Sequence, residues 1–165
     1  MVVSMHRDWS EALLDLLNTT PVVDGAPTEA LDGAWLRANG AAGQRVHDAR
    51  RIRDDLQRVV RGEVPGDVLD GYLRGVSQTP EIVGGAVTWR LDAGWPARMV
   101  LAWGELQAAM PGRLRPCANG ECHLFLLDRS RGGTGRWCSM SGCGNRMKAR
   151  RHYGRTAGDR GPGAR

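Results

Sequence analysis

The chain has 165 residues and a formal net charge of +5, and 41% of its residues are hydrophobic. This length predicts one ordinary domain, or one small domain joined to a module held together by a metal. The sequence has no run of 18 or more apolar residues, so we expect no transmembrane helix and no membrane partner. Its first ten residues, MVVSMHRDWS, contain neither the apolar core nor the cleavage site of a secretory signal, which predicts a cytoplasmic protein.

Helical spacing of apolar residues occurs in five segments of the first 112 residues. We expect helices over residues 9–18 with Ser10 as N-cap, 28–39 with Thr28 as N-cap, 44–61, 65–79 and 96–110. The third is the clearest, with one apolar stripe and Gly62 at its end. Its six arginines are interleaved with aspartates, so a solvated, salt-bridged surface is a better interpretation than a nucleic-acid face.

Two other segments of this region do not have helical spacing. Residues 22–26 (VVDGA) predict a turn or linker. Residues 82–91 alternate with a shorter period around Gly84 and Gly85, which predicts one or two short strands. The sequence therefore predicts a mainly helical domain over residues 1–112 with a short β element.

All four cysteines of the chain lie close together near its C-terminus, as Cys117-x4-Cys122 and Cys138-x4-Cys143. Two pairs with matched spacing predict one structural zinc ion held by four thiolates. The alternative is two disulfides or four buried thiols, but disulfides need an oxidising compartment and isolated thiols need no repeated spacing. Because four thiolates complete the shell, we expect His123 and His152 to lie outside it.

The segments around the cysteines predict a hairpin and a helix. An apolar run at residues 124–127 and a returning strand at residues 136–137 would form a hairpin across a glycine-rich turn. A helix follows from Cys143 to about Gly154, and we expect Met147 to pack it against Phe125 or Trp137. Residues 156–165 are rich in Gly and Arg and are expected to be disordered.

Positive charge is concentrated in this C-terminal region. Residues 1–114 carry 12 basic and 15 acidic groups, whereas residues 115–165 carry 11 basic and three acidic groups. The imbalance predicts a polyanionic partner for the C-terminal region, with a solvated tail as the alternative. Guanidinium groups bind phosphate and can contact guanine with two hydrogen bonds. The candidate DNA contacts are Arg136, Arg146, Lys148, Arg150, Arg151 and Arg155.

Several of these residues occur in a known pattern. RPCAN at 115–119, RWCSM at 136–140, CGNR at 143–146, Lys148 and RRH at 150–152 resemble the CGNR zinc finger. This resemblance implies that Cys117, Cys122, Cys138 and Cys143 bind zinc and that residues 113–155 bind DNA. LDLLNT at residues 14–19 is similar to the start of the ABATE domain, which commonly precedes this finger in bacterial transcription regulators.

Together these observations predict an α+β fold, mostly α, with a helical N-terminal domain and a zinc-stapled hairpin-and-helix module. We expect a zinc-dependent DNA-binding transcription regulator whose N-terminal domain serves dimerisation or effector sensing. An RNA- or protein-interaction module is the alternative. We do not expect an enzyme, because a four-thiolate site leaves zinc no open position and no carboxylate–histidine pattern occurs. Asn18 and Thr19 could bind a ligand, although a helix C-terminus followed by a turn is the preferred interpretation.

Overall fold

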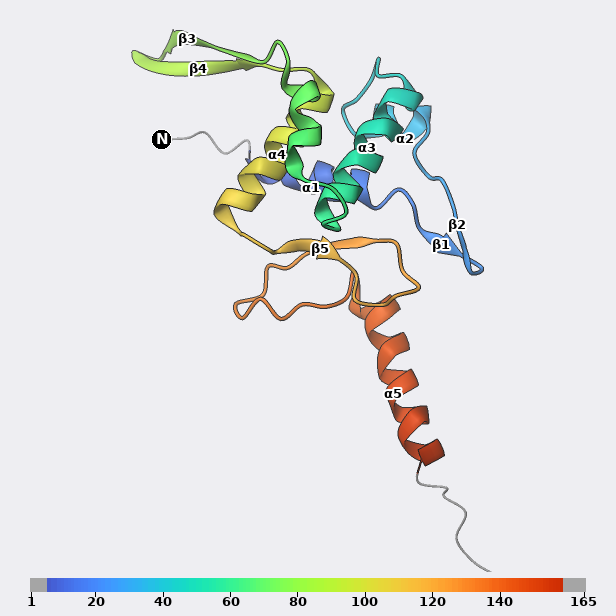
Figure 1. The fold of residues 1–165 in the computed structure, drawn as a ribbon. Helices are drawn as coiled ribbons and strands as arrows, with labels where there is room; N and C mark the ends of the chain where they lie inside the picture. Colours follow the sequence, from blue (N-terminus) through green and yellow to red (C-terminus); the bar gives the residue numbers. More distant parts are fainter. Residues whose placement is uncertain (1–5, 159–165) are drawn as a thin grey trace, which may run out of the picture.

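The computed structural model describes residues 6–158 and has an α+β fold made mostly of helices (Figure 1), as predicted. Its elements are α1 (His6–Leu17), β1 (Val22–Val23), β2 (Ala26–Pro27), α2 (Gly33–Ala38), α3 (Val46–Val60), η1 (Gly66–Leu73), β3 (Ser77–Val83), β4 (Ala86–Asp92), α4 (Trp95–Ala109), β5 (Leu114–Pro116), β6 (Phe125–Leu127), η2 (Met140–Gly144) and α5 (Asn145–Gly158). The strands form three separate two-stranded antiparallel sheets. Among the described residues, no helix has both the length and the apolar composition needed to cross a membrane.

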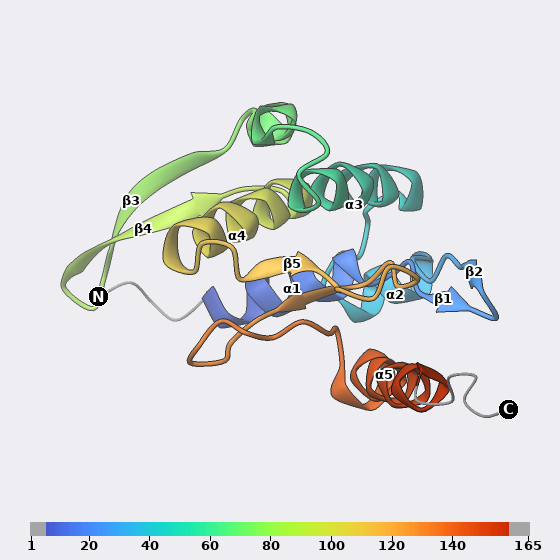
Figure 2. The same ribbon diagram turned by 60° about the horizontal axis from the view of Figure 1, so that its bottom comes forward.

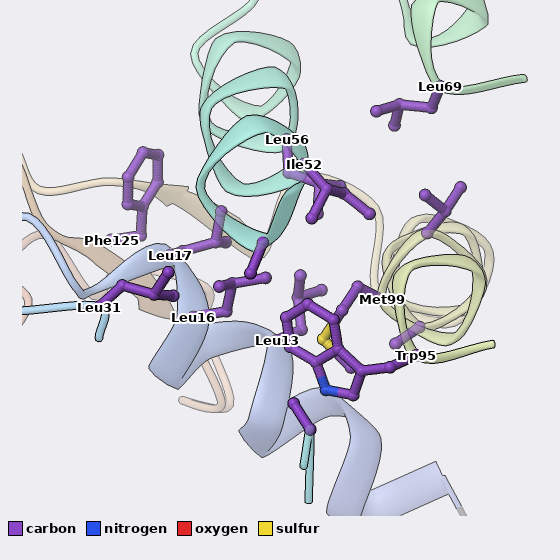
Figure 3. Packing of buried hydrophobic residues seen from close by; sticks show 14 of the residues in the cluster. Leu13, Leu16, Leu17, Leu31, Ile52, Leu56, Leu69, Trp95, Met99 and Phe125 are labelled. Carbon is purple, nitrogen blue, oxygen red and sulfur yellow. The ribbon is translucent and has the colours of Figure 1, made fainter. Parts of the chain in front are cut away.

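The hydrophobic core lies where α1, α3 and α4 meet (Figure 3). Leu13, Leu16 and Leu17 of α1 are fully buried against Leu56 of α3 and Met99 of α4. These residues follow the helical spacing seen in the sequence, so the helices predicted over residues 9–18, 44–61 and 96–110 are confirmed with small shifts at their ends.

Two predicted helix starts are wrong. Helix α1 begins at His6, so Ser10 lies inside it and is not its N-cap. Helix α2 begins only at Gly33, because Asp32 caps it by accepting a hydrogen bond of 2.7 Å from the Trp35 backbone N–H. The hydroxyl of Thr28 instead donates to the carbonyl oxygen of Pro21.

The segment predicted as a turn or linker is a small hairpin formed by β1 and β2. Its turn residues Asp24 and Gly25 both have positive φ angles, of 51° and 81°. Asp-Gly is a favoured pair for this type of two-residue turn. The sequence identified the turn, but not the pairing of the two short strands beside it.

The segment after α3 also differs from the prediction. Pro65 precedes a 3₁₀ helix, η1, which ends at Leu73 rather than at residue 79, and Val68 of this helix is exposed. Strands β3 and β4 are longer than expected, with seven residues each, and they pair around Gly84 and Gly85. Figures 1 and 2 show this hairpin extending away from the helices.

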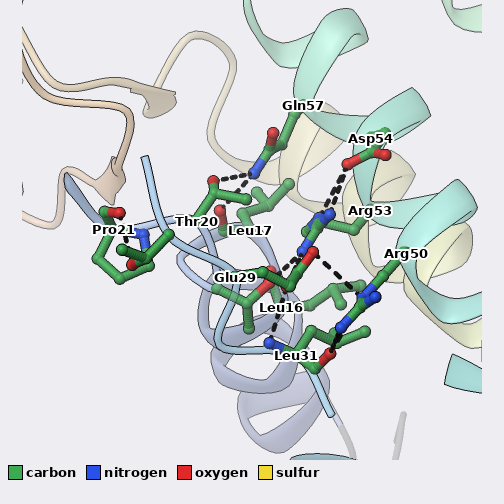
Figure 4. A network of polar contacts seen from close by, with 12 residues as sticks. Leu16, Leu17, Thr20, Pro21, Glu29, Leu31, Arg50, Arg53, Asp54 and Gln57 are labelled. Atoms are coloured by element: carbon green, nitrogen blue, oxygen red, sulfur yellow. Dashed lines mark hydrogen bonds and ion pairs between the residues drawn. The ribbon is translucent and has the colours of Figure 1, made fainter. Parts of the chain in front are cut away.

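One arginine of α3 lies inside the fold rather than on the predicted solvated surface. Arg53 is only 4% exposed, and it donates to Glu29 at 2.6 Å and to Thr19 at 3.1 Å (Figure 4). It also forms an ion pair with Asp54. Four residues on, Gln57 donates to the carbonyl oxygen of Leu17. These contacts join α3 to the segment that follows α1, and they satisfy polar groups that burial would otherwise leave unpaired.

Candidate metal centre and nucleic-acid interface

The first cysteine pair lies in the loop of a hairpin formed by β5 and β6. Leu114 pairs with Leu127, and Pro116 pairs with Phe125. The predicted pairing of residues 124–127 with residues 136–137 is therefore wrong. Both strands of the actual hairpin bring an apolar residue, Leu114 and Phe125, into the hydrophobic core, which explains why these two strands pair.

This hairpin is attached to the helices through Phe125, whose side chain is 1% exposed and belongs to the same core as Leu17 (Figure 3). The side-chain amide of Asn18 accepts a hydrogen bond of 2.7 Å from the Phe125 N–H and donates to its carbonyl oxygen at 3.3 Å. Asn18 thus supplies the hydrogen bonds that a neighbouring strand would provide. Thr19 is buried and bonded to Leu16 and Arg53, so both residues have structural partners.

The second cysteine pair leads into the C-terminal helix. Ser139 accepts a hydrogen bond from the Gly142 N–H at 3.0 Å and so caps η2, a π turn that contains Cys143. Helix α5 then runs from Asn145 to Gly158, four residues beyond its predicted end. Cys143 therefore precedes α5 by two residues, and the cysteine and the helix are held in one continuous helical segment.

The four cysteine sulfur atoms, of Cys117, Cys122, Cys138 and Cys143, lie within 4.8 Å of one another. A tetrahedral zinc ion with Zn–S distances of about 2.3 Å requires sulfur atoms about 3.8 Å apart. The distance between the Cys122 and Cys138 sulfurs is 3.7 Å, which matches this value. Since all four sulfurs lie within 4.8 Å of one another, shifts of no more than about 1 Å would complete a tetrahedral zinc site. The four cysteines form one structural zinc site.

Hydrogen bonds to sulfur complete the surroundings of the site. The buried side-chain amide of Asn119 donates to Cys143 Sγ at 3.4 Å, and the Cys138 N–H donates to Cys117 Sγ at 3.5 Å. Such donors stabilise thiolates and orient them for the metal. Asn119 lies within the RPCAN segment of the finger, and its position in the sequence alone gives no sign of this bond.

The cysteines have altered acidities in the absence of a cation. Burial raises the pKa of Cys122 to about 11 and also raises the pKa of Cys138. Burial acts in the same sense on Cys143, but the hydrogen bond from Asn119 and contacts with the other sulfurs outweigh it and lower its pKa. Four thiolates this close repel one another, so the site needs a cation to hold all of them in the ligand form.

A second cluster orders the glycine-rich loop between the cysteine pairs. Buried Asp128 accepts hydrogen bonds from Ser130, from the Gly135 N–H at 2.8 Å and from Arg115 at 2.6 Å. The hydrogen bonds from Ser130, followed by those from Gly135 and the charge of Arg115, lower the pKa of Asp128. A Cβ atom on Gly135 would lie 2.9 Å from the Asp128 carboxyl group. The glycine is therefore required for the close approach of this loop to the Asp128 carboxyl group.

The cationic residues of α5 are exposed to solvent. Arg146, Lys148, Arg150 and Arg151 are exposed, whereas Met147 is half-buried. Arg150 donates two hydrogen bonds to Glu121, at 2.8 and 2.7 Å, which connects α5 to the loop between the first two cysteines. Figure 1 shows α5 projecting from the body of the protein. The side chain of Arg155 lies outside the described residues.

Arg136 lies apart from the helix in sequence. It is exposed, and its guanidinium group lies 5.2 Å from the centroid of the Trp137 ring. The Arg136 carbonyl oxygen accepts a hydrogen bond of 2.8 Å from the Ala118 N–H, so this segment contacts the first cysteine loop. His123 and His152 are both exposed and neither belongs to the sulfur cluster, as expected.

The C-terminal part of the chain is similar to a known protein family. Residues 113–156 match the CGNR zinc finger. The matched region contains all four cysteines and most of α5, so the zinc site described above coincides with the finger. No curated protein matches the chain. The similarity of residues 14–19 to the ABATE domain stays a prediction.

Proposed function

We propose that this protein is a zinc-dependent DNA-binding transcription regulator in which α5 contacts the DNA. The observation that carries the proposal is the cationic helix itself. The zinc site holds its first turn, Arg150 and Glu121 connect its middle to the finger, and exposed Arg146, Lys148 and Arg151 lie along it. A short polar helix is only marginally stable alone in water, so the zinc site offsets the cost of ordering it.

The charge of α5 supports a polyanionic partner. The segment from Asn145 to Gly158 contains five basic residues and no acidic residue. Phosphate contacts by such groups give binding that weakens as salt rises, because the DNA releases bound cations when the protein binds. Arg146 lies next to the zinc-held turn, which makes it the candidate for contacting a guanine edge, while Arg151 is a candidate phosphate contact.

Arg150 has a different position from the other cations because it is already paired with Glu121. Both members of this pair are exposed, with half or more of each side chain accessible, so the pair contributes little stability. A phosphate could replace Glu121 as the partner of Arg150. Replacing Glu121 with Gln should therefore strengthen DNA binding, since it removes a nearby negative charge and releases Arg150.

The test is a salt titration of duplex binding by fluorescence anisotropy. Arg151→Ala should lower affinity on every sequence and reduce the slope of log affinity against log salt by about 0.9. Arg146→Ala should cost about 1–3 kcal/mol on a preferred sequence only. Arg58→Ala is the matched control, because Arg58 is an exposed arginine of α3 that should not contact DNA. Unchanged binding in the α5 variants would contradict the proposal.

The alternative is an RNA-binding or protein-binding module, and one observation favours RNA binding over protein binding. Tyr153 is an exposed aromatic residue on α5 and packs edge-to-face with His152 at 5.9 Å. Exposed aromatic rings stack on unpaired bases. Tighter binding to single-stranded RNA than to duplex DNA, lost in Tyr153→Ala, would support this alternative.

We also propose that the protein is not an enzyme, because four thiolate ligands leave the zinc ion no position for water or substrate. The proposed roles of the N-terminal domain, residues 1–112, are dimerisation and effector binding. A groove of about 690 Å³ between α1 and α4 has a mainly apolar lining that includes Ala102, Leu106, Ala109 and Met110, and its polar lining residues are Ser10, Glu105 and Arg129. It is the described feature best suited to an apolar effector.

A further inference from the structure

The β3–β4 hairpin has one apolar face and one polar face. Residues directly opposite each other in an antiparallel pair point to the same side of the sheet, and alternate residues point to opposite sides. The register places Ile82 opposite Val87 and Pro80 opposite Trp89. One face therefore consists of Gln78, Pro80, Ile82, Val87, Trp89 and Leu91.

This apolar face is open to solvent. Ile82 is 78% exposed, Val87 is 65% exposed and Trp89 is 62% exposed. A two-stranded hairpin is marginally stable in water unless its apolar face packs against something. Exposed apolar patches of this kind mark interaction sites in soluble proteins. The hairpin therefore needs a partner that residues 6–158, the part of the chain that the structure describes, do not supply.

Charge indicates what kind of partner fits. The apolar face has no charged residue, whereas Glu81 and Arg90 lie on the opposite face and form an ion pair of 3.5 Å. The apolar face therefore offers no charged group for an ion pair with an acidic protein, a basic protein or a nucleic acid. The complementary surface is another uncharged apolar sheet face, and a second copy of the chain presents one in equal amount.

We propose that this apolar face packs against the same face of a second copy, which gives a dimer with two-fold symmetry. Two sheets packed in this way lie about 10 Å apart with interdigitated side chains. The inference deepens the proposed function, because one finger covers a small site and two related fingers would read a palindromic sequence. It assigns dimerisation to the hairpin rather than to the helices.

The size of the apolar face determines how tightly the two copies are expected to associate. Each strand has seven residues, so the face measures roughly 23 Å by 10 Å, well below the area of about 800 Å² that each partner contributes to a standard interface. The free protein should therefore dimerise weakly. Binding of both fingers to one duplex should strengthen the dimer, because the second contact becomes intramolecular.

The test is sedimentation velocity of the full zinc-loaded chain without DNA, from low-micromolar to near-millimolar concentrations. Val87→Lys places a charge on the apolar face, and Val83→Lys is the matched control, because Val83 is 57% exposed on the opposite face of the same hairpin. The wild type and Val83→Lys should dimerise with equal affinity. Val87→Lys should weaken the dimer by at least about tenfold.

Zinc content and circular dichroism check that each variant is folded, and Trp89→Ser provides a second disruption of the face if Val87→Lys misfolds. A wild type that stays monomeric over the whole range would overturn the proposal, as would a dimer that Val87→Lys and Trp89→Ser leave unchanged. Since no DNA is present, either result leaves the DNA-binding proposal intact. Loss of duplex binding with an intact dimer would count only against that proposal.

Discussion

Replacing Phe125 with Ala should destabilise the helices, although Phe125 lies in strand β6 of the zinc finger. Its ring is 1% exposed and belongs to the core formed by Leu13, Leu16 and Leu17. Removing a buried Phe side chain costs about 3–5 kcal/mol. The Arg61 guanidinium, 4.9 Å from the ring centroid, adds roughly 0.5–1 kcal/mol. For a chain of this size the loss corresponds to a decrease in Tm on the order of 10 °C.

The assay is thermal unfolding followed by far-UV circular dichroism with zinc in excess, which reports mainly on the helices. Phe125→Leu is the matched control, since it keeps an apolar side chain in the core and should lower Tm much less. If the helical region and the finger unfolded independently, Phe125→Ala would reduce zinc affinity alone. A helical transition at the wild-type temperature would refute the shared core.

Three further perturbations test the site and the core. Cys138→Ser should abolish zinc binding and the fold of residues 115–155, and elemental analysis that still finds one zinc per chain would contradict this. The pKa of Asp128 is lowered in the folded protein, so the ionised carboxylate stabilises the fold. This contribution is complete above the ordinary Asp pKa of about 4 and is lost as pH falls through the lowered pKa. The Tm difference between wild type and Asp128→Asn should therefore be constant from neutral to mildly acidic pH and should shrink only in stronger acid. Arg53→Ala should cost about 1–3 kcal/mol in urea unfolding, whereas Arg58→Ala, at an exposed ion pair, should cost less than about 0.5 kcal/mol.

The sequence predicted those features that depend on residues close together in the chain. The apolar spacing along α1, α3 and α4 reflects the period of a helix, and each of these helices packs the predicted stripe into the core. The repeated spacing of the cysteines predicted the zinc site because each pair forms one short loop. Gly62 ends α3 with a φ angle of 74°, which only glycine adopts readily.

The sequence did not predict the features that depend on contacts between distant segments. Residues 124–127 could pair with either of two neighbouring segments, and the choice of β5 follows from the shared core that Leu114 and Phe125 enter. The burial of Arg53 requires Glu29 and Thr19 to meet it from another part of the chain. Neither partner is identifiable from the local pattern of α3.

The role of Asn18 illustrates the same limit at the candidate site. From sequence it could end a helix or bind a ligand, and its amide instead bonds both backbone groups of Phe125, 107 residues away. The sequence of residues 82–91 predicted one or two short strands, but such a pattern cannot show whether the apolar face of the β3–β4 hairpin is covered. The exposure of that face follows from the position of the hairpin, which extends away from the helices (Figure 1).

The most direct test of DNA binding is the salt dependence of duplex affinity for the full zinc-loaded chain. Phosphate contacts from Lys148 and Arg151 should give a slope of log affinity against log salt of about −1.8, since each contact contributes about 0.9. The zinc-depleted chain, whose α5 loses its anchor, should bind at least about tenfold more weakly at the same salt concentration. A flat salt dependence, or equal affinity with and without zinc, would contradict a DNA-binding helix held by the zinc site.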